Sequence, residues 1–211
     1  MGADAQDGPA ARVFFALVPP PPLREALGVL AASVAQRAHG RALPADNLHV
    51  TLAFIGAWPA SRLAHWMDVG ARCAGAATHV TLDRLGGFRR AGVAWIGTRT
   101  IPPPLHDLAD ALGAALVAAN VAVDTRAFAP HLTLARRCRG PFPDEPAGPY
   151  EWSVDAIALM RSHTEPAGAR YFEVGRWPLR KGWIATFRPG PWRPVAPERR
   201  PIRSTSLGRA A

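Results

Sequence analysis

The chain has 211 residues, of which 48% are hydrophobic and 19% charged, and its formal net charge is +9. This length suffices for one domain with a sizeable core or for two joined lobes, and the composition excludes a fibrous, membrane-spanning or largely disordered protein. The segment from Lys181 onward carries +6 of the net charge, so the rest of the chain is not basic enough to indicate a nucleic-acid-binding domain by charge alone.

Hydrophobic periodicity and turn residues predict ten elements along the chain. In chain order they are a strand over 12–18, a helix over 21–38, a strand over 48–55, a helix over 61–74, strands over 79–85 and 93–98 joined at Gly86-Gly87, a helix over 103–119, and strands over 128–135, 152–161 and 170–174. The helices are too few and too unevenly placed for a doubly wound parallel sheet, so the predicted class is α+β. A helix precedes a similar strand in each half, which predicts two lobes with antiparallel-rich sheets, a pseudo-twofold repeat and a groove between them.

Composition divides the chain into three regions. We predict a disordered leader over residues 1–11, a two-lobed domain over 12–183, and a flexible, basic Pro/Arg-rich tail over 184–211. The tail could add weak, salt-sensitive affinity for RNA, although a solvated extension is the simpler interpretation. The leader lacks the apolar segment of a signal peptide, and Cys73 and Cys138 lie in no disulfide-like or metal-like spacing, so we expect a cytoplasmic protein.

A short sequence motif occurs in two of the predicted strands, as HVTL over residues 49–52 and as HLTL over residues 131–134. Residues two apart in a strand project from the same face, so each His shares a face with the Thr that follows it. The aliphatic residues between them face the other way. Two imidazoles and two hydroxyls in one groove could handle a phosphate without a metal ion.

The same phrase occurs a third time, as HVTL over residues 79–82. His49 and His131 lie between apolar flanks, as expected of central strands, whereas His79 follows Ala-Ala-Thr and leads to Asp83-Arg84, as expected of an edge strand. We therefore predict that His49 and His131 form the catalytic pair and that His79 does not take part.

Other chemistries lack their patterns in this chain. Two histidines without a nearby carboxylate or thiolate make a poor zinc site, and no Ser stands in a GxSxG context. The Gly86-Gly87 pair lacks the lysine of a phosphate-binding loop. On spacing alone, His49 and His131 could equally be strand histidines that face solvent.

The two phrases resemble the paired His-x-Thr-x motifs of the 2H phosphoesterase superfamily. Within it they are similar to those of the RNA 2′,3′-cyclic phosphodiesterases, also called 2′-5′ RNA ligases (the LigT/ThpR family). RVFFALVPP, AGVAWIG and IALMRSHTEPAGARYFEVGRW resemble further segments of that family, so the resemblance spans about residues 12–180. The family has an ordinary strand residue where His79 stands.

This resemblance implies hydrolysis of RNA 2′,3′-cyclic phosphate ends to 2′-phosphomonoesters with no metal or cofactor. It implies that His49 donates a proton to the leaving oxygen and that His131 accepts one from water. Thr51 and Thr133 would donate hydrogen bonds to the phosphate. Arg136 matches a family arginine and is a candidate for binding the substrate. Strict alternation from Thr133 places it on the opposite strand face, but it could still reach the phosphate beyond the end of the strand.

Two aromatic residues, Phe54 and Tyr171, are candidates for stacking on a base, although a core role is the simpler interpretation of each. The implied partner is RNA with a 2′,3′-cyclic phosphate end or a small cyclic nucleotide, bound by a monomer with no membrane and no obligate protein partner. Two alternatives stay open, namely 2′-5′ ligation of tRNA halves and non-catalytic binding of RNA ends.

Overall fold

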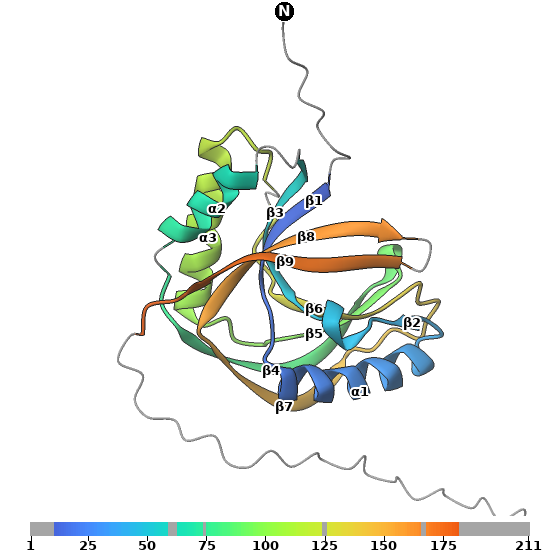
Figure 1. The fold of residues 1–211 in the computed structure, drawn as a ribbon. Coiled ribbons are helices and arrows are strands. Elements are labelled where there is room, and N and C mark those ends of the chain that lie inside the picture. Colours follow the sequence, from blue (N-terminus) through green and yellow to red (C-terminus); the bar gives the residue numbers. More distant parts are fainter. Residues whose placement is uncertain (1–10, 59–62, 74, 124–125, 166–167, 182–211) are drawn as a thin grey trace, which may run out of the picture.

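The computed structural model describes residues 11–58, 63–73, 75–123, 126–165 and 168–181 (Figure 1). The elements over these residues are β1 (Ala11–Leu17), α1 (Pro21–Arg37), β2 (Arg41–Ala42), the single 3₁₀ turn η1 (Ala45–Asn47), β3 (Val50–Trp58), α2 (Leu63–Arg72), β4 (Thr78–Phe88), the 3₁₀ turn η3 (Arg89–Ala91), β5 (Val93–Gly97), α3 (Pro103–Ala118), β6 (His131–Arg136), β7 (Glu145–Val154), β8 (Ala156–Glu165) and β9 (Gly168–Pro178). The predicted α+β class is confirmed.

The strands form one nine-stranded sheet in the order β7-β4-β5-β6-β3-β1-β8-β9, and the short β2 pairs with β6. Each neighbouring pair is antiparallel. The middle of this order is its thinnest point, because β3 and β6 share only the pair Val50 and Leu132. Four strands lie on each side of that junction along the order, and the predicted pseudo-twofold relation of two lobes stays a prediction.

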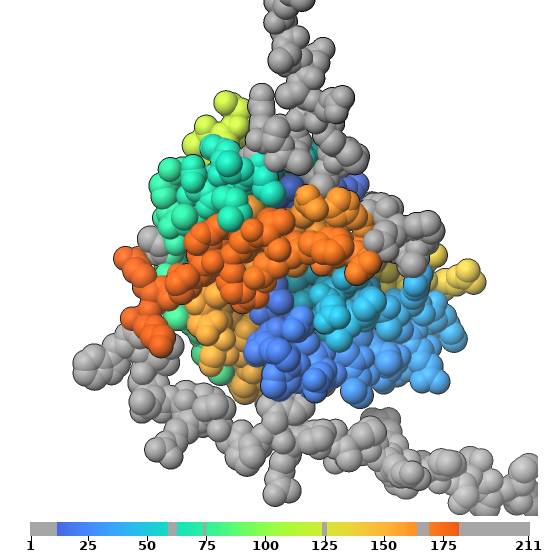
Figure 2. All heavy atoms as spheres, in the orientation of Figure 1, coloured from blue at the N-terminus to red at the C-terminus, as the bar shows by residue number. Residues whose placement is uncertain are grey.

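The three described helices bury aliphatic stripes in one large core. Helix α1 begins with prolines at its first two positions, where a missing N–H costs nothing. It packs against β6, while α3 packs against β3, and α2 against β8 and β9. Figure 2 shows β9 (orange) crossing one side of the molecule between α2 (teal) and α1 (blue). The motif His and Thr side chains lie on the other face of their strands.

Three expectations from the sequence are wrong in detail. Gly86-Gly87 is not a turn, because β4 continues to Phe88 and the chain reverses in η3. The predicted strand over 152–161 is two strands, β7 and β8, which meet around Asp155. Strand β4, which carries His79, is not at an edge, because β7 pairs along its outer side.

The boundaries predicted for the leader and the tail stay predictions. Apart from Ala11, which begins β1, residues 1–11 lie outside the described residues, as do residues 184–211. No helix in the described part of the chain is long and apolar enough to cross a membrane.

Candidate active site

The two motif strands meet at one point, and that point joins their His and Thr residues. Val50 of β3 pairs with Leu132 of β6 in antiparallel register. Extending this register by one residue in each direction sets His49 opposite Thr133 and Thr51 opposite His131. Each imidazole therefore lies across the junction from the hydroxyl of the other motif.

Both imidazoles are oriented by the same local hydrogen bond. Nδ1 of His49 lies 2.8 Å from the carbonyl oxygen of Asn47, and Nδ1 of His131 lies 2.8 Å from that of Ala129. A carbonyl oxygen only accepts, so each Nδ1 carries a proton and donates it. The other nitrogen, Nε2, is thereby directed away from the main chain.

Asn47 also links the residues around His49 to β9, the last strand in the order of the sheet. Its side-chain amide donates a hydrogen bond of 2.8 Å to the carbonyl oxygen of Ala169 at the start of β9. The residue that orients His49 through its backbone is therefore held in place through its side chain. This role of Asn47 could not be predicted from the sequence, because it depends on where β9 lies.

Aromatic rings surround His49. Its ring centroid lies 4.9 Å from that of Phe14 and 4.8 Å from that of Tyr171. Phe54 continues the group, with its centroid 6.4 Å from that of Phe14 and with 51% of its surface exposed. Phe54 is therefore not a core residue, and Tyr171 is only half-buried. Phe14 was not singled out in the sequence, because it lies in an otherwise apolar strand.

A second aromatic pair lies against His131. Its ring centroid is 4.9 Å from that of Phe88 and 6.1 Å from that of Trp95. The Trp95 ring lies over Gly86, where a Cβ atom would come within 2.2 Å of it. Glycine at this position is needed to make room for the indole, and that role replaces the predicted turn.

Both motif strands carry a bulge directly after the Thr. In β3, Leu52 is the extra residue between Thr51, which pairs with Ala16, and Ala53, which pairs with Phe15. The bulge makes two successive residues face the core, so Phe54 returns to the face of Thr51.

Strand β6 repeats this arrangement and corrects the expectation for Arg136. Leu134 is the extra residue between Thr133, which pairs with Trp95, and Ala135, which pairs with Ala94. Strict alternation is therefore broken, and Arg136 lies on the face of Thr133 rather than on the opposite one. Its exposed guanidinium is close enough to influence the titration of His49.

The environment of His49 disfavours its charged form. Burial lowers the pKa of His49 from 6.5 to about 4, and the positive charge of Arg136 acts in the same direction, as does that of His131 when its ring is protonated. The hydrogen bond to the Asn47 carbonyl opposes them, because it favours a protonated ring. In the free protein, His49 is neutral at pH 7.

The third copy of the phrase is engaged by a neighbouring strand. Nε2 of His79 contacts Oε2 of Glu151 in β7, and the Thr81 hydroxyl donates a hydrogen bond of 2.9 Å to the same oxygen. The reactive nitrogen of His79 therefore faces a carboxylate rather than an open groove.

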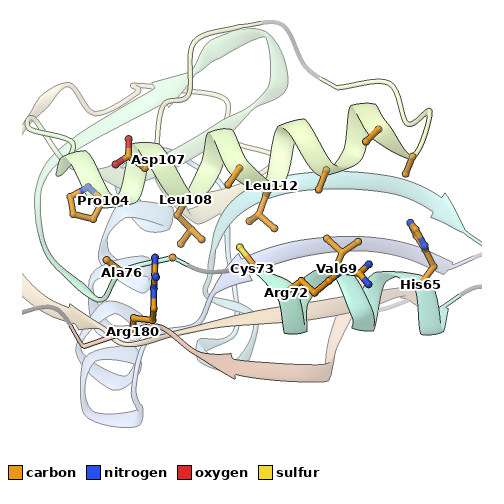
Figure 3. Close-up of a pocket in the computed structure, with 15 residues that line it drawn as sticks. His65, Val69, Arg72, Cys73, Ala76, Pro104, Asp107, Leu108, Leu112 and Arg180 are labelled. Carbon is orange, nitrogen blue, oxygen red and sulfur yellow. The ribbon is translucent and has the colours of Figure 1, made fainter.

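A cavity of about 750 Å³ lies elsewhere, between α2 and α3 (Figure 3). Leu108 and Leu112 of α3 point into it across from Val69 of α2, and Arg72 and Arg180 lie along its lower side. None of the predicted site residues lines it.

Metal-binding groups are scarce in the described part of the chain. No group of three or more His, Cys, Asp or Glu side chains that could hold a metal ion occurs there. Both cysteines, Cys73 and Cys138, are free.

Comparison with known proteins gives a consistent result. The sequence model of the 2′-5′ RNA ligase superfamily matches residues 19–166. A curated Escherichia coli protein named RNA 2′,3′-cyclic phosphodiesterase is 32% identical over 170 residues, which cover 80% of this chain and 96% of that protein. A protein of the same name from Thermus thermophilus is 30% identical over 181 residues, covering 80% of this chain and 90% of its own length.

Solved structures agree with the sequence comparison. E. coli LigT, described as complexed with 3′-AMP, matches with a TM-score of 0.75 and 31% identity over 82% of this chain and all of that one. TT0787 of T. thermophilus matches with a TM-score of 0.69 and 28% identity, over 81% of this chain and 98% of that one.

Proposed function

This chain belongs to the 2′-5′ RNA ligase superfamily, and on that premise we propose that it hydrolyses RNA 2′,3′-cyclic phosphate ends to 2′-phosphomonoesters. The observation that carries the proposal is the meeting of two imidazoles, each fixed through Nδ1, at the single junction of β3 and β6. The names of the relatives support the substrate class. We propose that the enzyme acts as a cytoplasmic monomer.

The reaction needs one proton removed and one supplied. Nε2 of His131 takes a proton from water, and the water oxygen attacks phosphorus. The bond from phosphorus to the 3′ oxygen then breaks, and that oxygen takes a proton from Nε2 of His49. The product keeps its phosphate on the 2′ oxygen. Imidazole suits both roles because it titrates near neutrality.

Hydroxyl and guanidinium groups would stabilise the phosphate. Thr51 and Thr133 face the groove beside the imidazoles and can donate hydrogen bonds to the non-bridging oxygens, on which charge grows in the transition state. Arg136 supplies a fixed positive charge on the same face. Phe54 and Tyr171 line the His49 side, where they can contact the base of the terminal nucleotide.

The lowered pKa of His49 sets a condition on its role as the acid. A histidine with a pKa of about 4 holds no proton at pH 7 in the free protein. A bound phosphate anion favours the imidazolium form and so raises that pKa. We therefore propose that substrate binding itself charges His49 and turns it into a proton donor.

Product analysis on an RNA oligonucleotide that ends in a 2′,3′-cyclic phosphate tests this function. We expect a 2′-phosphomonoester, formed at the same rate with and without EDTA. Ligation to a 5′-hydroxyl oligonucleotide as the main outcome would identify a ligase instead. Tight binding with the substrate unchanged would identify an RNA-end-binding protein. A rate that falls on addition of EDTA would contradict metal independence.

A further inference from the structure

The ring of His131 packs against an aromatic surface that hydrolysis by water does not need. Phe88 meets the His131 ring edge to face, and its centroid lies 5.6 Å from that of Trp95. The indole of Trp95 is laid over Gly86, which leaves no room for a side chain beneath it. These contacts pack one side of the Phe88 ring against Trp95 and His131.

Phe88 is nevertheless 41% exposed. Singly exposed apolar side chains are common on protein surfaces, but the ring of Phe88 differs from them because it is packed against the imidazole of His131. A nucleobase is the flat, apolar ligand that such a ring accepts by stacking. Phe54, 51% exposed, is the corresponding exposed ring on the His49 side.

We propose that Phe88 and Trp95 form a second nucleoside subsite, which binds the nucleoside whose 5′ oxygen enters or leaves on the His131 side. The proposal rests on the function proposed above. In an in-line displacement the entering and leaving oxygens lie on opposite sides of phosphorus. The leaving 3′ oxygen and its nucleoside lie towards His49, so an entering 5′ hydroxyl brings its own base towards His131.

The corresponding step balances without a cofactor. The 5′ hydroxyl gives its proton to Nε2 of His131, its oxygen bonds to phosphorus, the bond to the 3′ oxygen breaks, and that oxygen takes a proton from Nε2 of His49. The product is a 2′-5′ phosphodiester with a free 3′ hydroxyl. The reverse reaction cleaves a 2′-5′ linkage to a 2′,3′-cyclic phosphate and a free 5′ hydroxyl.

Positive charge adjoins the proposed subsite. Arg89 and Arg90 follow Phe88 directly in η3 and are exposed. The backbone N–H of Cys138 donates a hydrogen bond of 2.9 Å to the carbonyl of Gly92, which brings the chain after β6 beside this turn. Arg137 and Arg139 flank Cys138 and are also exposed. Such a cluster suits the phosphates of a strand that extends from the second nucleoside.

Two substrates that differ by one nucleoside test the subsite. Adenosine 2′,3′-cyclic phosphate occupies the His49 side alone, whereas 2′-5′-linked ApA occupies both sides. We expect Phe88→Ala to lower the ratio of kcat/KM for ApA to kcat/KM for the cyclic nucleotide about tenfold, the effect of losing one stacked base. Phe88→Tyr, which keeps the ring, should restore the ratio.

Phe172 provides a matched control. It is 39% exposed, but it packs with His163 and Arg170 away from the motif residues. Phe172→Ala should leave both rates unchanged. Equal losses on both substrates in Phe88→Ala would mean a purely structural role and would overturn the subsite.

The same assay separates this inference from the proposed function. Wild-type protein that hydrolyses the cyclic nucleotide but neither cleaves nor binds ApA would overturn the subsite alone. Wild-type protein inactive on the cyclic nucleotide would overturn the hydrolase. In that case the binding of ApA still tests the subsite. If the subsite exists, the dissociation constant of ApA should rise about tenfold in Phe88→Ala.

Discussion

Residues 49–52 and 79–82 have the same sequence, HVTL, yet their surroundings give them different chemistry. His49 is held through Nδ1 by a backbone carbonyl, which turns Nε2 away from the main chain. His79 contacts Glu151 through Nε2, and Thr81 donates to the same carboxylate oxygen. Strand pairing decides this difference, because β3 meets the second motif strand whereas β4 has a glutamate of β7 beside it. The motif over residues 49–52 therefore meets a second His-x-Thr motif on its partner strand, whereas the motif over residues 79–82 does not.

The largest contrast should be seen when each histidine is removed. We expect His49→Ala and His131→Ala each to lower kcat on a 2′,3′-cyclic nucleotide about 10²- to 10⁴-fold, the usual contribution of a positioned acid or base. His79→Ala should leave kcat unchanged, because its imidazole is engaged by Glu151. Circular dichroism of all three variants checks that they fold. An inactive His79→Ala variant with the other two active would reverse the assignment.

Loss of the Thr51 or Thr133 hydroxyl should lower kcat, though less than loss of a motif histidine, and loss of the Thr81 hydroxyl should not. Thr51→Val and Thr133→Val keep the shape of the side chain but remove one hydrogen-bond donor to the phosphate. Each should reduce kcat about 10²-fold. Thr81→Val is the matched control, since its hydroxyl donates to Glu151 and should not affect kcat. Similar losses in all three variants would mean that the hydroxyls act through folding rather than through the phosphate.

Substitution of Arg136 tests directly what lowers the pKa of His49. Its positive charge helps lower the pKa of His49 to about 4, so Arg136→Ala should raise that pKa. Saturating phosphate should raise it in the wild type, and NMR titration of the imidazole measures both shifts. Arg139→Ala, which removes another exposed arginine near the end of β6, is the control. An unchanged pKa in Arg136→Ala would place the guanidinium away from His49.

The lowered pKa of His49 also makes the stability of the protein depend on pH. An unfolded histidine titrates near pH 6.5, so between pH 6.5 and 4 the unfolded state binds more protons than the folded state. The contribution of His49 to stability is therefore present above pH 6.5 and is lost as the pH falls through 4. Arg136→Ala should lose less stability over this window than the wild type, as urea unfolding at each pH would show.

Local pattern predicted much of the architecture and both motifs of the candidate site. The α+β class and the helix that begins at Pro21 were predictable because hydrophobic periodicity and helix-start signals are local. The face of Arg136 was not, because Leu134 bulges only in response to the pairing of β6 with β5. Glu151 and Phe88 were missed for the same reason, since sheet register, and not sequence distance, brings them to a histidine.

The smallest effect on stability should come from the contact between Glu151 and the third His-x-Thr motif, residues 79–82. Glu151→Gln removes the negative charge that faces His79 and Thr81, and the side chains of His79 and Glu151 are about one-third exposed or less. Partly exposed pairs contribute little, so we expect the free energy of unfolding to fall by about 0.5 to 1 kcal/mol in urea titrations. Glu145→Gln, which breaks the more exposed pair with Arg37, should cost less. Activity should be unchanged in both, because neither carboxylate lies at the β3–β6 junction. If Glu151→Gln gave His79 a measurable share of the hydrolysis, the carboxylate alone would be what separates the third copy from the other two.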